Sequence, residues 1–342
     1  KLILMSHLGR PKGQVKEDLR LAPVGKRLGE LLGKEVIIAR DCIGEETRKL
    51  VSGMQAGDVV LLENLRFHKE EEANDEGFAR ALAEYADLYV NDAFGTAHRA
   101  HASTEGIARF LPAVAGLLME KEIQFLGKLA VQPDSPYIAV IGGAKVSSKI
   151  GVIDRLLEKV DVLIIGGGMC YTFLKAKGFE VGNSLVENDK VNMAFELIKK
   201  ADANNVKLML PADHLVVEKV EEGARARTVD TNAIPSNMIG VDIGPKTIRA
   251  YRREIERGRT VFWNGPMGVF EIEKFAKGTN KIARALAACK GTTVIGGGDS
   301  VAAVKKTGVD VRIDHVSTGG GASLEYLEGK ELPGISALAD RD

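Results

Sequence analysis

The sequence is poor in the features that mark disulfide-rich, zinc-binding or membrane proteins. Its 342 residues include three cysteines, Cys42, Cys170 and Cys289, whose odd number and wide spacing argue against a disulfide framework. No CxxC pair or Cys/His spacing indicates a zinc site. The longest apolar runs, such as residues 160–165, are far too short to cross a bilayer. These absences favour a reducing compartment, and we expect a cytoplasmic protein.

The chain also lacks an excess of charge of either sign. Lys and Arg together number 47, as do Asp and Glu, so the net charge favours no nucleic-acid or membrane-surface partner. No secretory signal begins at Lys1, because no apolar segment with a cleavage site follows it. Any positively charged site must therefore be local.

Short apolar runs alternate with amphipathic segments along nearly the whole chain. Most runs are continuously hydrophobic, which is typical of parallel strands covered on both faces. Repeated βαβ units predict an α/β fold of two doubly wound, parallel-sheet (Rossmann-like) domains. The predicted strands are residues 2–6, 35–39, 58–63, 88–92, 137–143, 161–167, 207–211, 260–265 and 292–298. The predicted helices include residues 21–31, 75–86, 189–201 and 245–258.

The length of the chain favours two domains, and one segment suggests where they join. Residues 113–131 read as one long helix, and the QPDSP sequence after them breaks the chain before the next strand. We expect an N-terminal domain over 1–113, an interdomain helix over 114–130 and a C-terminal domain over 131–324, with a cleft between them. The alternative is a crossover helix within one large sheet.

Four apolar runs in the second half end in glycines that open a helix or turn: AVIGGAKVSSK, LIIGGGMCY, VIGGGDSVA and HVSTGGGAS. Glycine lets the backbone approach a ligand, and a helix N-terminus offers free N–H groups to phosphate. Tight strand–helix turns also use glycine, but four such turns in one domain favour a phosphate site. The patterns GxxxxGK[ST], GxGxxG and GxSxG are all absent, which disfavours a P-loop enzyme, a nicotinamide dehydrogenase and a serine hydrolase.

Charged residues accompany these glycines. Lys145 and Lys149 are four apart, so a helix beginning near Val146 would direct both toward one cleft. Asp299 directly follows a glycine triplet and is either a Mg²⁺ ligand or a helix N-cap. Glu271, shortly after the WNGPMG sequence, either accepts hydrogen bonds from a ribose or lies on the surface.

Basic residues follow three predicted strands of the first half. Because such strand ends converge on one edge of a sheet, we expect them to form one anion pocket, although each histidine alone is more simply a packing or capping residue. The acidic run around His68 reads as a solvated loop and the early turn of a helix, and we assign His68 no role. The pocket residues are His7, Arg10, Arg66, His98 and Arg99. A phosphate site and an anion site on two lobes suggest phosphoryl transfer in a cleft that closes and excludes water.

The motifs resemble those of phosphoglycerate kinases, in the order found in that family and over nearly the whole chain. They are SHLGRPKG, LLENLRFH, NDAFGTAHRAHAS, GGAKVSSKIGVI, WNGPMGVFE, VIGGGDS and HVSTGGGASLE. The resemblance to the bacterial-type enzymes implies reversible transfer of phosphate between 1,3-bisphosphoglycerate and MgADP, giving 3-phosphoglycerate and MgATP. It further implies Mg²⁺ as cofactor, a monomer, and a C-terminal segment, about 325–342, that returns to the first domain.

The same resemblance implies roles for individual residues. The catalytic set is Lys145, Lys149, Gly320 and Gly321, with Asp299 as the Mg²⁺ ligand. The triose-phosphate set is His7, Leu8, Gly9, Arg10, Arg66 and Arg99. The nucleotide set is Gly143, Lys149, Gly167, Gly168, Gly240, Asn264, Pro266, Glu271, Gly297, Gly298, Asp299 and Ser300.

One family feature is missing from the sequence. Family members carry an N-terminal strand, an Asp-x-Asn-x-Pro loop and a basic helix, and none precedes Lys1. We expect an incomplete sequence or a truncated chain; a chain starting at Lys1 should bind MgADP almost normally but turn over poorly. The alternatives are a different phosphotransferase and a non-catalytic nucleotide-binding fragment.

Overall fold

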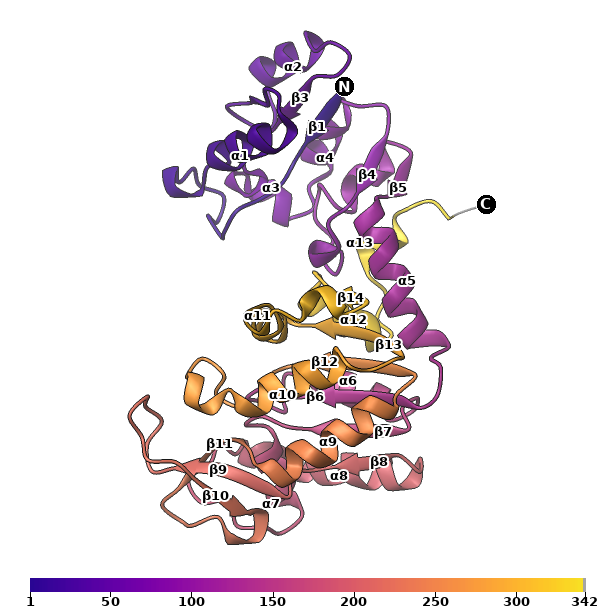
Figure 1. The fold of residues 1–342 in the computed structure, drawn as a ribbon. Coiled ribbons are helices and arrows are strands. Elements are labelled where there is room, and N and C mark those ends of the chain that lie inside the picture. The colour runs from indigo at the N-terminus through magenta and orange to yellow at the C-terminus, as the bar shows by residue number, and fades with distance from the viewer. Residues whose placement is uncertain (341–342) are drawn as a thin grey trace. The chain divides into compact units, whose positions relative to one another are not determined.

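The computed structural model describes residues 1–340, and the chain divides into two compact units (Figure 1). Unit 1 contains Lys1–Glu120 and the segment from Glu331 onward, and unit 2 contains Lys121–Lys330. Helix α5, Leu117–Val131, runs from the end of unit 1 into unit 2. Within residues 1–340, no helix is both long and apolar enough to span a membrane.

Unit 1 contains two small parallel sheets. One has the order β1-β3-β2, from Leu2–Leu4, Val59–Leu61 and Ile37–Ile38, and the other pairs β4, Tyr89–Asn91, with β5, Ala113–Ala115. Strand β1 is an edge strand, and its Leu2 is half exposed. The main core of unit 1 includes Val60, Leu62 and Phe78. The helices are α1 (Ala22–Leu32), α2 (Glu45–Ser52), α3 (Lys69–Glu72), α4 (Glu76–Ala83) and α13 (Pro333–Ser336).

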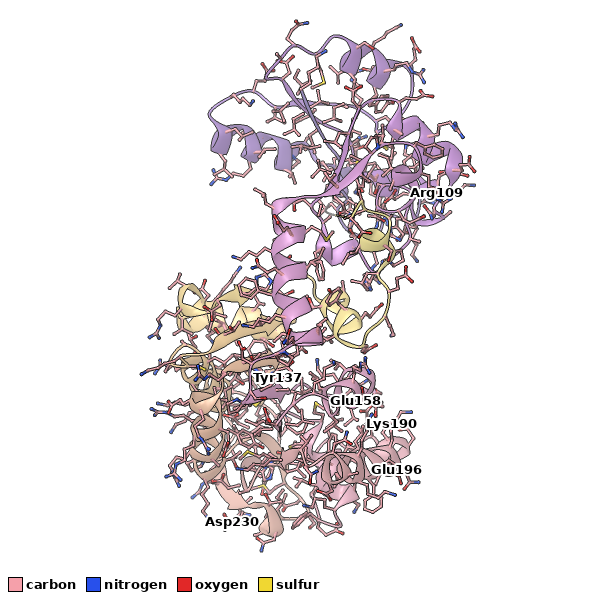
Figure 2. The ribbon with its side chains drawn as sticks, turned by 90° about the vertical axis from the view of Figure 1, so that its right-hand side faces the viewer. Arg109, Tyr137, Glu158, Lys190, Glu196 and Asp230 are labelled. Carbon is pink, nitrogen blue, oxygen red and sulfur yellow. The ribbon has the colours of Figure 1, made fainter. Side chains whose placement is uncertain are left out.

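Unit 2 is built on a six-stranded parallel sheet of order β14-β13-β12-β6-β7-β8, counted over the described residues. Burial on both faces explains the unbroken apolar runs: every residue of β6, β7 and β12 is buried, including Tyr137 at the start of β6 (Figure 2). The strands are β6 (Tyr137–Ile141), β7 (Val162–Ile165), β8 (Lys207–Met209), β12 (Thr260–Asn264), β13 (Thr292–Gly296) and β14 (His315–Val316).

A second, antiparallel sheet of unit 2 has the order β10-β9-β11. Its strands are β9 (Asp213–Val217), β10 (Arg227–Asp230) and β11 (Ile239–Ile243). The helices of unit 2 besides α5 are α6 (Ile150–Leu156), α7 (Cys170–Ala176), α8 (Val191–Ala203), α9 (Pro245–Arg257), α10 (Lys277–Leu286), α11 (Gly298–Thr307) and α12 (Gly321–Leu327).

The α/β prediction and its two Rossmann-like domains are confirmed, and each predicted strand contains an observed one. Two boundaries differ. Residues 113–115 form β5 rather than the start of the long helix, and α5 begins only at Leu117. The chain joins unit 1 again at Glu331 rather than near 325, because α12 packs against α6 of unit 2. The antiparallel sheet was not predicted.

Candidate functional site

One pocket of unit 2 lies at the carboxyl ends of three neighbouring strands, β6, β12 and β13. Strands β6 and β12 are adjacent, and the chain runs outward from them in opposite directions, through β7 and β8 on one side and β13 and β14 on the other. Such a switch point is where open α/β sheets bind ligands. We call this space, of about 300 Å³, the glycine pocket. Its lining is Gly143, Ala144, Lys145, Ser148, Lys149, Asn264, Gly265, Pro266, Gly297, Gly298, Asp299 and Ser300.

Glycine is required where the turns after β6, β7 and β12 pack backbone against backbone. Gly167 has a φ of +67°, and a Cβ there would lie 2.5 Å from the amide nitrogen of Gly143. The N–H of Gly143 donates to the carbonyl of Pro266 at 2.9 Å, and the N–H of Gly167 donates to that of Met267 at 3.1 Å. Gly167 and Gly168 therefore support the pocket wall from behind and are not among its lining residues.

The surroundings of the glycine pocket shift the pKa of Lys149 strongly. Burial lowers its pKa to about 8, although the nearby Asp299 carboxylate favours the charged form. Its ammonium group donates to Oδ1 of Asn264. The Nδ2 of Asn264 is buried and has no hydrogen-bond partner among the described residues. Lys149 and Asn264 both line this small space, and the cation suits an anionic ligand.

Helix α11 directs its N-terminus at the same pocket. Gly297 is its N-cap residue, with a φ of +87° and no side-chain cap, so Asp299 in the first turn is not the N-cap. Ser300 is fully buried, and its hydroxyl accepts from the N–H of Gly265 at 2.6 Å. This bond fixes the α11 turn to the turn after β12, and leaves the exposed Asp299 side chain on the pocket wall.

The expected helix beginning near Val146 is wrong. Residues 146–149 form turns instead, in which the N–H of Lys149 donates to the carbonyl of Val146 at 2.8 Å, and α6 begins at Ile150. The hydroxyl of Ser148 donates to the carbonyl of Lys145 and holds this turn at 2.9 Å. Lys145 and Lys149 nevertheless line the same pocket.

Besides Gly167 and Gly168, four residues of the predicted catalytic and nucleotide sets lie outside the lining of the glycine pocket: Gly240, Glu271, Gly320 and Gly321. Glu271 is exposed. Gly240 lies in β11, where a Cβ would overlap the hydroxyl of Tyr171, so close packing alone accounts for a glycine there. Gly320 has a φ of +55° and is the N-cap residue of α12, which begins at Gly321.

Unit 1 holds a second pocket, also of about 300 Å³, which we call the arginine pocket. Its residues follow the ends of β1, β3 and β4, and include all five that the basic clusters predict. Leu8 is 40% exposed and does not line it. Gly95 and Thr96 were missed as lining residues, although both lie in the NDAFGTAHRAHAS motif. The lining is His7, Gly9, Arg10, Arg66, Gly95, Thr96, His98 and Arg99.

Arg66 is held rigidly in this pocket. Its side chain is 6% exposed, its Nη1 donates to the carbonyl of Gly9 at 3.2 Å, and Glu72 lies 3.5 Å from its Nε. Burial, together with the positive charge of Arg66, lowers the pKa of His7 to about 4. His7 is therefore neutral near pH 7, while the arginines carry the positive charge of the pocket, which suits an anion.

The sequence as a whole matches one family. The family model for phosphoglycerate kinase matches residues 1–330. The chain belongs to the phosphoglycerate kinase family. It is 60% identical to the phosphoglycerate kinase of Pelotomaculum thermopropionicum and 59% identical to that of Moorella thermoacetica, in each case over the whole chain and 87% of the relative. The chain is thus a phosphate-transferring enzyme.

Solved structures of phosphoglycerate kinases share its fold. The enzyme from Coxiella burnetii has a TM-score of 0.89 at 41% identity, over 98% of this chain and 85% of that one. The enzyme from Pyrococcus horikoshii has a TM-score of 0.86 at 35% identity, over 99% of this chain and 86% of that one. Both pockets lie within residues 1–330, which the family model matches.

Proposed function

We propose that the chain catalyses the reversible transfer of a phosphoryl group between 1,3-bisphosphoglycerate and MgADP, giving 3-phosphoglycerate and MgATP, with the nucleotide bound in the glycine pocket. The observation that carries the proposal is the convergence of Lys149, Asn264 and the N-terminus of α11 on one space at the switch point of the sheet. These groups suit phosphate oxygens. Gly143, Pro266, Gly297, Gly298 and Ser300 would supply backbone contacts and shape.

The arginine pocket would hold the triose phosphate. His7, Arg10, Arg66 and Arg99 combine a neutral imidazole with three guanidinium groups in a neutral protein. Guanidinium forks bind phosphate and carboxylate bidentately, and 3-phosphoglycerate carries both groups. Gly9 would present its backbone, whereas Leu8 would contribute from the pocket rim.

The chemistry needs charge neutralisation rather than a general base, because the acceptor is already a carboxylate. Charge is spread over the oxygens of the transferring group, so Lys145, Lys149 and the N-terminus of α12 at Gly320 and Gly321 would act by electrostatic stabilisation. This accounts for pockets rich in Lys, Arg and glycine turns that hold no catalytic triad among their lining residues.

Asp299 fits a magnesium ligand. It is the one carboxylate among the residues that line the glycine pocket, where without a cation it would repel a phosphate. When bound, Mg²⁺ neutralises phosphate charge and fixes the nucleotide's orientation. The proposal also includes Glu271, Gly240, Gly167 and Gly168 as residues along the nucleotide, with Glu271 at the ribose.

We propose a cytoplasmic monomer that acts on small molecules and has no nucleic-acid or membrane partner. The balanced net charge and the free Cys42, Cys170 and Cys289 support this setting.

The test is a coupled assay on the purified protein of verified mass, with 3-phosphoglycerate and MgATP. We expect ADP formation that depends on 3-phosphoglycerate and is lost in Lys149→Ala but kept in the control Lys290→Ala. ADP binding without any phosphoryl transfer would overturn the proposal and favour a non-catalytic nucleotide-binding protein. Transfer to other carboxylates at equal rates would favour a different phosphotransferase.

A further inference from the structure

Three side chains of unit 1 that the proposed reaction does not use lie together near the surface. The Oδ1 of Asp41 lies 2.7 Å from Nε2 of His68 and 3.6 Å from Sγ of Cys42. The three potential ligand atoms all lie within 4.8 Å of one another. Linear spacing does not reveal this cluster, since Cys42 is in the loop between β2 and α2 and His68 follows β3.

The donor set has a distinct chemistry. A thiolate, an imidazole and a carboxylate together select a borderline or soft divalent ion rather than Mg²⁺ or Ca²⁺. One Zn²⁺ would balance the charges of one thiolate and one carboxylate. Three protein ligands with a fourth, open position is an arrangement that zinc adopts in proteins.

Two of the three distances between the ligand atoms are close to what such an ion needs. With Zn–S near about 2.3 Å and Zn–N or Zn–O near about 2.0–2.1 Å, the ligand atoms of a tetrahedral ion lie about 3.3–3.6 Å apart. The distance of 3.6 Å between Sγ of Cys42 and Oδ1 of Asp41 already fits. The distance of 2.7 Å between Nε2 of His68 and Oδ1 of Asp41 would increase by about 0.6 Å as the ion replaces the proton of their hydrogen bond.

The surroundings hold the ligands in place. The N–H of Cys42 donates to Oδ1 of Asp41 at 2.7 Å, and the hydroxyl of Thr47 donates to the carbonyl of Asp41 at 3.1 Å. The His68 ring packs on Phe78, with ring centroids 5.2 Å apart. The exposed side of the cluster is open to water, because the Asp41 side chain is 52% exposed while Cys42 is buried.

We propose that Asp41, Cys42 and His68 form a binding site for one thiophilic divalent cation of the Zn²⁺ class. The site is separate from the predicted magnesium site, since Asp299 is in unit 2. It is independent of the proposed reaction, so it survives if that proposal fails. Because burial raises the pKa of the Cys42 thiol, the ion must displace its proton.

A bound ion would link two loops of unit 1. An ion at this site joins the loop before α2 to the residue that ends the 3₁₀ turn Leu65–Phe67, which carries Arg66. Binding to the folded state alone raises the melting temperature.

The test uses Co²⁺ and Zn²⁺ on the metal-free protein without nucleotide. We expect one Co²⁺ per chain, with a thiolate-to-cobalt charge-transfer band and visible bands of tetrahedral intensity. One equivalent of Zn²⁺ should remove these bands, and an excess of Mg²⁺ should not. Cys42→Ser, His68→Ala and Asp41→Asn should each weaken Zn²⁺ binding at least about tenfold. Cys289→Ser is the matched control, because its thiol contacts Gly258 instead.

Two results would overturn the site. One is the absence of a charge-transfer band in the wild-type protein. The other is an unchanged metal affinity in His68→Ala, or a band that disappears in Cys289→Ser. Since Cys42 is buried and its variant can lose stability, the partly exposed His68 and Asp41 variants decide the matter if Cys42→Ser does not fold.

Discussion

At the scale of single residues, the basic clusters of unit 1 predicted which side chains lie together, but not the contacts that each side chain makes. The five basic residues predicted for one pocket of unit 1 do line one pocket. By contrast, no motif indicates that Asn264 receives a hydrogen bond from Lys149 and keeps a buried, unpartnered Nδ2. Such pairings join residues 115 positions apart and depend on the register of neighbouring strands, which linear spacing does not encode.

Gly240 provides a residue-scale prediction. In Gly240→Ala the new methyl group would overlap the hydroxyl of Tyr171, whose own hydrogen bond to Nδ1 of His214 holds the ring in place. Because overpacking of this kind costs about 1–3 kcal/mol, we expect the free energy of unfolding to fall by that amount in urea titrations.

The control for this substitution is Gly223→Ala. A Cβ at Gly223 meets no atom within 4 Å, so its unfolding free energy should change little. Equal losses in the two variants would show that packing on Tyr171 is not what requires glycine at position 240.

At the scale of elements, the strands of the six-stranded sheet were predictable from their unbroken apolar runs, because strands buried on both faces are apolar throughout. The start of α5 was not. Two N–H groups of its first turn, those of Leu118 and Met119, donate to Oδ1 of Asp92 at 2.7 and 2.9 Å. A cap from a residue 26 positions away cannot be recognised from the local sequence.

The antiparallel strands were missed for a different reason. β9 begins Asp-His and β10 has the sequence RTVD, with few apolar residues in an unbroken run. A buried polar contact also joins β9 to the residue after β10, because Nε2 of His214 donates to Oγ1 of Thr231 at 3.0 Å. Periodicity carries no information on such contacts.

Helix α5 and the loop after β14 are joined by a buried carboxylate. Glu122 accepts from Nε2 of His315 at 2.8 Å, and from the N–H and hydroxyl of Thr318 at 2.6 and 2.8 Å. Burial opposes its ionisation, but these hydrogen bonds outweigh burial and hold the pKa of Glu122 below its ordinary value. The loop fixed in this way leads directly into the glycines before α12.

We therefore expect Glu122→Gln to destabilise unit 2 by about 3 kcal/mol, because it removes one charge from a buried hydrogen-bonded pair. Urea unfolding followed by the fluorescence of Trp263, a buried residue of unit 2, would measure the change. Glu196→Gln, at an exposed pair on α8, should change stability by less than about 1 kcal/mol. A loss in Glu122→Gln no larger than in this control would contradict the role assigned to the pair.

At the scale of the whole molecule, stability should depend on pH through buried histidines. Burial lowers the pKa of His214 from 6.5 to about 4. The unfolded chain then takes up a proton before the folded one does, so the stabilisation is present above about pH 6.5 and is lost as the pH falls toward 4. The pKa difference corresponds to about 3 kcal/mol.

Urea titrations between pH 7 and pH 4.5 would measure this loss, and His214→Gln should make the pH dependence shallower. The pH dependence of stability that His68 contributes has the opposite sign, because its hydrogen bond to Asp41 raises the pKa of His68. Its contribution is present below about pH 6.5 and is lost as the pH rises through its raised pKa, so His68→Gln should flatten the alkaline side instead. An unchanged acid-side slope in His214→Gln would contradict the assignment.

The central claim is that each unit binds one substrate, the nucleotide in the glycine pocket and the triose phosphate in the arginine pocket. Calorimetric titration of ADP and of 3-phosphoglycerate into wild type, Lys149→Ala and Arg66→Ala tests it most directly, with thermal melts to verify folding. Loss of a charge-assisted contact should weaken binding by about 10- to 100-fold. We predict that Lys149→Ala loses ADP affinity alone and Arg66→Ala loses 3-phosphoglycerate affinity alone. If each folded variant weakened both ligands equally, or neither, the assignment of one substrate to each pocket would be wrong.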